Sequence, residues 1–260
     1  MTKKLQSITN KIAPAAAVAA ILIIWYFCSD FEVVPAYMLP SPVSVVKAFV
    51  SNFGIMLRQA AVTLQEAFYG LLIGIILAFI LAVLMDRFDF LYKALYPVLV
   101  ITQTIPTIAI APLLVLWMGF DMAPKITLVV ITTFFPVSIG LLSGFRSVDK
   151  DAVNLMRAMG AGRFQIFRHI KFPGALPSFF SGLRISASYS VVGAVVSEWL
   201  GGFEGLGVYM TRVKKAYAFD KMFAVIAFIS IVSILLMGLV SLIERVSMPW
   251  LFKNKNKKEN

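Results

Sequence analysis

Very few side chains in this sequence have the chemistry of an enzyme or of a metal site. The chain contains one histidine, His169, and one cysteine, Cys28. A lone thiol forms no internal disulfide, and a lone imidazole has no second histidine with which to share a metal ion. No Gly-x-x-x-x-Gly-Lys-Ser/Thr segment is present to hold nucleotide phosphates. We therefore predict a chain that is not an enzyme, has no catalytic or metal-binding residues and binds no cofactor of its own.

The composition indicates a membrane protein. Hydrophobic residues make up 60% of the chain and charged residues 14%, whereas soluble domains have about 45–50% and about 25%. A helix needs about 20 mostly apolar residues to cross the hydrocarbon layer. We therefore expect an all-α integral membrane protein with six transmembrane helices in a single domain, 1–260. The expected spans are 12–29, 60–85, 94–118, 123–145, 175–200 and 222–243.

Positive charge is distributed unevenly between the segments that connect these spans. If the N-terminus is cytoplasmic, sixteen of the 24 Lys and Arg residues fall on the cytoplasmic side. Cytoplasmic loops of membrane proteins are enriched in such residues. The bias predicts a multi-pass protein of the cell membrane with both termini in the cytoplasm. It also explains the net charge of +11 without a nucleic-acid partner. We expect the polar tail, 253–260, to be disordered.

Three charged residues lie well inside the expected spans, whereas Lys125, at the start of the span 123–145, is counted with the outer segments. Glu66 lies near the outer end of its span, where we expect it to reach water. Arg184 and Glu198 share the fifth span but are roughly 21 Å apart along a helix, so they cannot pair within one chain. Charged groups in a bilayer usually face protein or a wet cavity. Both are therefore candidates to line a pathway, and the alternative for Arg184 is that it snorkels to the cytoplasmic surface.

Small and polar residues mark two further features of the spans. Gly70, Gly74 and Ala78 continue from Glu66 at four-residue spacing, which favours close approach of a helix from a second subunit or from the same one. Polar residues on the third and fifth spans predict a translocation pathway, with hydrogen bonding between helices as the alternative. These pathway candidates are Gln103, Thr104, Thr107, Ser186, Ser190 and Glu198.

Three segments outside the expected spans carry local signals. Ser41 followed by Pro42 predicts the start of a short helix on the outer face. A second short surface helix is expected after Gly207. The glycine-rich stretch 201–207 follows a span, and we expect it to form an outer turn that acts as part of a gate.

The loop between the fourth and fifth spans, 148–174, is too polar to cross a membrane but is strongly patterned. We predict a short helix, a turn and a second short helix that is ended by Pro173 and Pro177. The two apolar faces consist of Leu155, Met156 and Met159, and of Phe164, Phe167 and Ile170. Exposed apolar surface usually has a partner. The alternative is that the loop rests on its own helices or on lipid headgroups.

This loop resembles the coupling loop of binding-protein-dependent ABC importers. The family pattern is Glu-Ala-Ala, three residues, Gly, nine residues, Ile, one residue and Leu-Pro. Here Gly160 is followed after nine residues by Ile170-Lys-Phe-Pro173. The acidic position and the two alanines fall instead on Asn154, Leu155 and Met156. Leu39-Pro-Ser-Pro42, Gln103-Thr-Ile-Pro106 and Gly205-Leu-Gly207 are also similar to the nitrate, sulfonate, taurine and thiamine-precursor branch of these permeases.

The resemblance implies a type I ABC importer permease fold and a set of partners. Two copies of the permease would form a homodimer in the lipid bilayer around one pathway. Each coupling loop would dock on a cytoplasmic ATPase dimer that uses the ATP, and an extracytoplasmic solute-binding protein would deliver a small polar solute. The residues that the resemblance assigns to ATPase coupling are Asn154, Leu155, Met156, Met159, Gly160, Ala161, Phe164, Ile170 and Pro173.

The substrate and the class of transporter leave alternatives open. The segments 197–202 and 210–215 look most like the vitamin-precursor members, so we expect a pyrimidine precursor of thiamine ahead of aliphatic sulfonates, taurine or nitrate. The alternative class is a stand-alone secondary transporter. Such a transporter is expected to show inverted repeats and broken helices with midspan ionisable groups, and the sequence has no convincing internal repeat.

Overall fold

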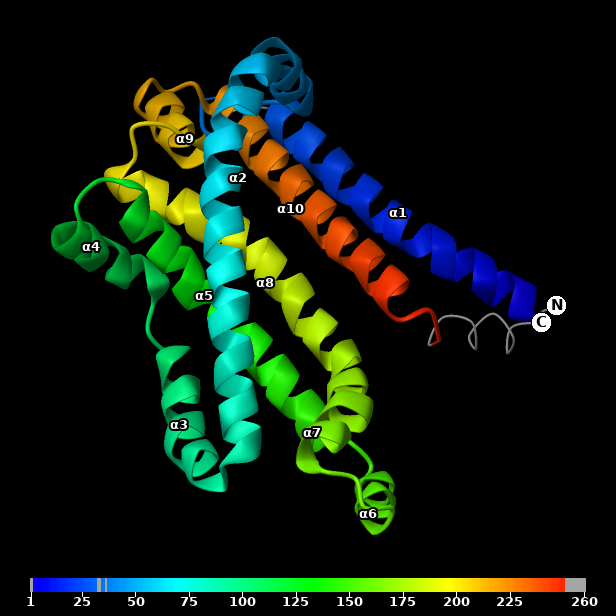
Figure 1. Cartoon of the computed structure of the whole chain (residues 1–260). Coiled ribbons are helices and arrows are strands. Elements are labelled where there is room, and N and C mark those ends of the chain that lie inside the picture. The colour runs from blue at the N-terminus through cyan, green and yellow to red at the C-terminus, as the bar shows by residue number, and fades with distance from the viewer. Residues whose placement is uncertain (1, 32–33, 36, 251–260) are drawn as a thin grey trace. The chain divides into compact units, whose positions relative to one another are not determined.

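The computed structural model describes residues 2–31, 34–35 and 37–250, with side chains from residue 13 onward. Every regular element in this part of the chain is a helix (Figure 1). The expected tail at 253–260 lies outside the described residues. The elements are α1 Thr2–Asp30, α2 Pro42–Arg87, α3 Asp89–Thr102, α4 Thr107–Met118, α5 Met122–Arg146, α6 Lys150–Ala158, α7 Arg163–Ile166, the π-helical turn η1 Phe167–Lys171, α8 Phe172–Gly201, α9 Leu206–Lys215 and α10 Phe219–Ser247.

The chain divides into two compact units. The first consists of Met1–Arg58 and Tyr209–Phe228, and the second of Gln59–Val208 and Ile229–Asn260. In the first unit, the indole N–H of Trp25 donates to the carbonyl oxygen of Pro40 at 3.0 Å, and its ring lies 5.8 Å from that of Phe223. Ser41 caps α2, because its Oγ accepts a hydrogen bond from the N–H of Ser44 at 3.2 Å. The predicted helix start is thus confirmed.

The number of membrane-spanning helices agrees with the sequence, but one boundary does not. Within the described residues, five helices are long and apolar enough to cross a membrane, or up to six if α3 and α4 form one bent span. The short outer helix expected after Ser41 is not separate from the second span, because α2 is continuous over 46 residues. The residues that join the two expected helices, 54–59, contain one glycine and no proline. A single glycine costs only about 1 kcal/mol in a helix.

The third expected span is not one straight helix. α3 and α4 meet at an angle of 98° across the break at 103–106. Pro106 explains the break, because proline has no N–H to donate and disfavours the helical conformation of the preceding residue. The hydroxyl of Thr104 donates to the carbonyl oxygen of Ile101 at 2.8 Å and so satisfies one acceptor at the broken end.

Glycines allow α5 and α8 to pack closely in the second unit. Gly144 on α5 lies against the backbone of Ala175, and Gly182 on α8 lies against the carbonyl group of Pro136. A Cβ atom at either glycine would overlap these atoms. Small residues at such crossings let two helix backbones approach and increase the van der Waals contact between them.

α2 packs on α5 through a row of small residues. Gly70 lies against Val129, and Gly74 lies against the hydroxyl of Thr133. Farther along α2, Ala78 is fully buried. The row therefore packs inside this chain, which was one of the two alternatives that its spacing left open.

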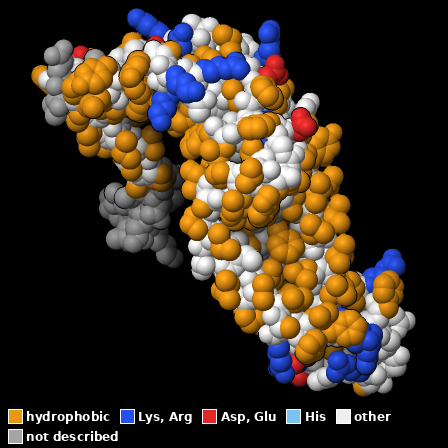
Figure 2. Space-filling view, turned by 90° about the vertical axis from the view of Figure 1, so that its left-hand side faces the viewer, with side chains coloured by type: hydrophobic (Ala, Val, Ile, Leu, Met, Phe, Trp, Pro, Cys, Tyr) orange, Lys and Arg blue, Asp and Glu red, His pale blue; other side chains and the backbone are white. Residues whose placement is uncertain are grey.

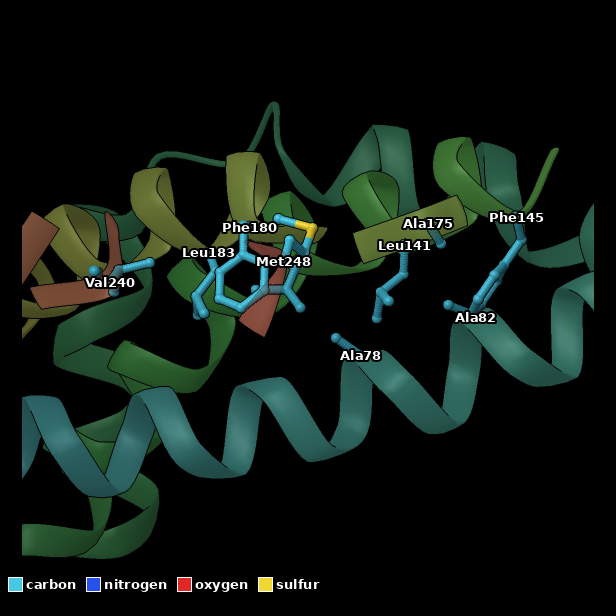
Figure 3. Packing of buried hydrophobic residues seen from close by; sticks show 11 residues of the cluster. Ala78, Ala82, Leu141, Phe145, Ala175, Phe180, Leu183, Val240 and Met248 are labelled. Carbon is cyan, nitrogen blue, oxygen red and sulfur yellow. The ribbon is translucent and has the colours of Figure 1, made fainter. Parts of the chain in front are cut away.

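The largest group of buried apolar side chains joins α2, α5, α8 and the C-terminal part of α10. Figure 3 shows Ala78 and Ala82 of α2 pointing toward Leu141 and Phe145 of α5. The other buried members are Val137, Ala175, Phe180, Leu183, Ala187, Val240 and Met248. On the outside, hydrophobic side chains cover much of the face in Figure 2, and Lys and Arg lie at both its upper and its lower edge. Such a large apolar surface suits a lipid environment.

Candidate functional site

α6 presents an apolar face to the solvent. Its start is set by Asp149, whose Oδ1 accepts a hydrogen bond from the N–H of Asp151 at 2.9 Å. Leu155 is 64% exposed and Met159 is 75% exposed, whereas Met156 is half-buried. Asn154, at the acidic position of the family pattern, is exposed as well. The described part of the chain therefore leaves the side chains of Leu155 and Met159 largely uncovered.

A tight turn follows α6 and exposes a third apolar side chain. Gly160 has φ +82°, in the left-handed region that glycine adopts at little cost. The N–H of Gly162 donates to Oε1 of Gln165 at 2.7 Å, which defines the start of α7. Phe164 is 72% exposed. The most exposed apolar residues of this segment are thus Leu155, Met159 and Phe164.

The second short helix does not end at Pro173, contrary to the expectation. α7 continues through η1 into α8, and the N–H of Phe172 bonds to the carbonyl oxygen of Phe167. Proline interrupts an α-helical hydrogen-bond series because it has no N–H. The wider π-turn immediately before Pro173 accommodates this interruption, and the chain continues as a helix. Ala161, Ile170 and Pro173 are half-buried rather than exposed.

The segment is attached to the ends of two long helices. Nζ of Lys171 lies 2.8 Å from both carboxylate oxygens of Asp86 on α2. The ring of Phe167 lies 5.4 Å from that of Phe145 on α5. A hollow of about 640 Å³ adjoins these contacts. It is lined by Val83, Asp86, Arg87, Arg157, Arg163, Phe164, Ile166, Phe167 and Lys171.

Three of the predicted pathway residues meet at the break between α3 and α4. Gln103 and Thr104 are exposed, and Thr107 is half-buried. Gln103 and Tyr189 line both of two hollows, with volumes of about 180 Å³ and about 480 Å³. Thr107 lines the smaller one. Thr104 lines neither.

The other predicted pathway residues lie inside the second unit. Ser186 is fully buried and donates to the carbonyl oxygen of Thr133 at 2.8 Å. Ser190 is 1% exposed and donates to the carbonyl oxygen of Ala187 in its own helix. The contact of Ser186 favours the alternative of hydrogen bonding between helices, whereas Ser190 is buried and bonded within α8. The pathway role therefore remains a prediction chiefly for Gln103 and Thr107.

Cysteine labelling separates the two groups of pathway candidates. In a Cys28→Ser background, we expect Thr107→Cys to react with a small water-soluble thiol reagent roughly tenfold faster than Ser190→Cys, because reaction at a buried site waits for local opening. The measurement is the labelling rate in native membranes. Absence of labelling at both positions would contradict a water-accessible pathway at the break.

Glu198 is buried where α8 ends and binds the turn that follows. It is 2% exposed, its Oε1 accepts a hydrogen bond from the hydroxyl of Thr63 at 2.6 Å, and its Oε2 accepts one from the N–H of Gly207 at 2.5 Å. Thr63 in turn accepts from the N–H of Leu206 at 2.9 Å, and Gln59 accepts from that of Gly205 at 2.6 Å. The carboxylate therefore holds the glycine-rich turn against α2. It lines neither of the two hollows at the break between α3 and α4.

Glu66 does not reach water, which corrects the expectation. It is fully buried, and its Oε1 lies 2.7 Å from Nζ of Lys125, which is only 6% exposed. Lys125, which was expected on the outer side, is therefore buried as well. The sequence does contain a pattern that could have predicted this polar contact face of α2. Gln59, Thr63 and Glu66 recur at helical spacing and therefore lie on one side of the helix.

Arg184 has a partner that the sequence analysis did not identify. Its guanidinium donates to Oε2 of Glu244, so an ion pair joins α8 to α10. The separation of 60 positions along the chain hides this pair from any local pattern. Arg184 and Glu198 are not paired, as their spacing predicted.

Sequence comparisons identify the protein family to which this chain is similar. The family described as "Binding-protein-dependent transport system inner membrane component" matches residues 70–247. A formylaminopyrimidine transport permease protein of Halalkalibacterium halodurans is 34% identical over 240 residues, which cover 92% of this chain and 96% of the relative. A putative aliphatic sulfonates transport permease protein of Bacillus subtilis is 31% identical over 234 residues, which cover 89% of this chain and 85% of the relative.

A structural comparison agrees at the level of the fold. The chain is similar to one in the inward-facing MetNI methionine ABC transporter, with a TM-score of 0.67 and 19% identity. The match covers 75% of this chain and 96% of the other. At this identity, the similarity shows that the two chains share an importer permease fold.

Proposed function

Since the chain belongs to the family of inner membrane components of binding-protein-dependent transport systems, we propose that two copies enclose one pathway for a small polar solute. The chain is a permease subunit of an ABC importer, a multi-pass protein of the cell membrane, and not an enzyme. This role implies an ATPase and a solute-binding protein as partners. In our proposal, the ATPase dimer binds and uses the ATP, and this chain binds no cofactor.

The uncovered apolar face of α6 and α7 is the observation that supports a docked ATPase. Leu155, Met159 and Phe164 are at least 64% exposed on a segment with too many polar residues to enter lipid. Lys171 and Phe167 connect the same segment to α2 and α5. We assign 148–174 as the cytoplasmic coupling loop, and movement of a docked partner would pass through it into the long helices.

The exposed apolar residues provide a direct test of this docking. Each of Leu155→Ser and Met159→Ser is expected to lower the affinity for the ATPase subunit by roughly tenfold, as expected for a central interface residue. The measurement is the amount of ATPase retained by the tagged permease across a dilution series. Val246→Ser is the control, because Val246 is also 75% exposed but lies on α10. Equal retention by all three variants would contradict the proposed surface.

A pyrimidine precursor of thiamine is the substrate that we propose. The formylaminopyrimidine relative supports this choice, with nearly complete coverage of both chains. Import of an aliphatic sulfonate, taurine or nitrate is the alternative, since the sulfonate relative is similar at almost the same identity.

Reconstitution with purified partners tests both the class of transporter and the substrate. The permease, its co-purified ATPase and its binding protein are placed in proteoliposomes, and uptake of labelled formylaminopyrimidine and taurine is measured with and without ATP. We expect ATP-dependent uptake of formylaminopyrimidine alone. Uptake by the permease alone, driven by a proton gradient, would instead establish the stand-alone secondary transporter.

A further inference from the structure

The break between α3 and α4 needs surroundings other than lipid. Residues 103–106 are exposed in this chain, and they interrupt a pair of helices that together are apolar enough to span a membrane. Non-helical backbone at membrane depth is tolerated only where it is buried in protein or lines a water-filled cavity. The two hollows beside Gln103 provide such a cavity.

The walls of these hollows combine apolar side chains with uncharged polar ones. The smaller hollow is lined by Thr102, Gln103, Ile105, Thr107, Ile131, Thr132, Tyr189, Val192, Gly193 and Val196. The larger one adds Ser143, Ser178 and Ser181 to an otherwise mostly apolar lining. Among these described residues there is no Lys, Arg, His, Asp or Glu. The walls therefore offer hydroxyl groups, one amide and two aromatic rings, those of Phe135 and Tyr189.

Gln103 and Tyr189 are the two residues that the hollows share. The amide of Gln103 can donate and accept hydrogen bonds at once, and it has no partner within the described residues. Tyr189 is 50% exposed, so much of its ring is available for contact. An aromatic face favours stacking on a planar ring. We infer that Gln103 and Tyr189 form a binding subsite for an uncharged, planar, hydrogen-bonding heterocycle on its way through the membrane.

The same walls disfavour anions. A sulfonate or nitrate that leaves water needs charged or strong N–H donors to replace its hydration. In these hollows, only hydroxyl groups and the Gln103 amide are available as side-chain donors, and Thr102 and Thr132 already donate to carbonyl oxygens of their own helices. This inference rests on the proposed function, and it names the chemical class of solute that the pathway accepts.

The test compares variants of the subsite in the complete importer. Gln103→Leu combined with Tyr189→Leu is expected to lower the maximal uptake rate of formylaminopyrimidine roughly tenfold, because one hydrogen bond and one ring contact are lost. The concentration of loaded binding protein that gives half-maximal uptake should stay unchanged, since docking precedes entry into the pathway. Tyr189→Phe keeps the ring and should retain most of the wild-type rate.

Matched controls distinguish recognition from a general effect on the helices. Gln65→Leu combined with Tyr69→Leu changes the same residue types on the exposed side of α2. Tyr69 is 49% exposed there, and neither residue lines either of these two hollows. We expect this control to import at the wild-type rate. Assembly of each complex is checked by size-exclusion chromatography.

The outcomes separate this inference from the proposed function. If wild-type importer takes up formylaminopyrimidine and the subsite variant matches the control, the subsite is overturned while the proposed function stands. If wild-type importer takes up taurine and no pyrimidine, both the proposed substrate and the uncharged subsite are overturned. Selective slowing by the subsite variant, with recovery in Tyr189→Phe, supports the subsite.

Discussion

Replacing Lys125 by methionine is expected to lower the free energy of unfolding by about 3–5 kcal/mol, because breaking a buried ion pair leaves an uncompensated charge. Glu66 is fully buried, and Nζ of Lys125 lies 2.7 Å from its Oε1. Oε2 of Glu66 has no hydrogen-bond partner among the described residues. The measurement is thermal unfolding in detergent, followed by the loss of monodisperse protein.

Two further variants show whether this effect comes from the unpaired charge. Lys125→Met combined with Glu66→Met should recover most of the stability, since apolar residues often replace a buried pair without loss. Lys93→Met breaks a solvent-exposed pair with Asp89, in which the lysine side chain is 76% exposed, and should cost less than about 1 kcal/mol. If Lys125→Met unfolds at the same temperature as Lys93→Met, the buried pair does not stabilise the fold as described.

Gly182→Ala is expected to destabilise the protein by about 1–3 kcal/mol through overpacking at the crossing of α5 and α8. A Cβ atom at Gly182 would overlap the carbonyl group of Pro136 and approach the backbone of Val137. Backbone atoms cannot rotate away as a flexible side chain can, so the two helices would have to separate. The same thermal unfolding measurement applies.

Gly238→Ala is the matched control for this prediction. Gly238 also lies in a long helix, but a Cβ atom there would meet nothing within 4 Å. Alanine is a better helix former than glycine by about 1 kcal/mol, so this variant should be unchanged or slightly more stable. A Gly182→Ala protein that unfolds at the same temperature as Gly238→Ala would show that the crossing has room to spare.

Features that depend on neighbours in the chain could be predicted from the sequence. The apolar segments identified the membrane class and most of the spans, because the length and hydropathy of a segment decide whether it can cross a bilayer. Ser41 and Pro42 located the start of α2, since a helix cap acts within one turn. The spacing around Gly160 located the turn between α6 and α7 and indicated the family, because a turn needs its glycine at a fixed position.

Several local predictions were wrong because proline and glycine signals depend on their surroundings. Pro173 was expected to end a helix, yet a π-turn carries the chain through it. The apolar segment after Gln103 was expected to continue straight, yet Pro106 and the two hollows belong to a sharp break. The separate outer helix before Gly54 is instead the first part of α2.

The amino-acid sequence by itself determined that this protein is a helical membrane permease with an exposed loop between its fourth and fifth expected spans. Only the tertiary structure decided the environment of its ionisable residues. Thr63 and Glu198 are 135 positions apart, and Glu66 and Lys125 are 59 apart, yet each pair forms a buried contact. Burial and pairing depend on which helices pack together, and helix packing brings together residues that no local pattern connects.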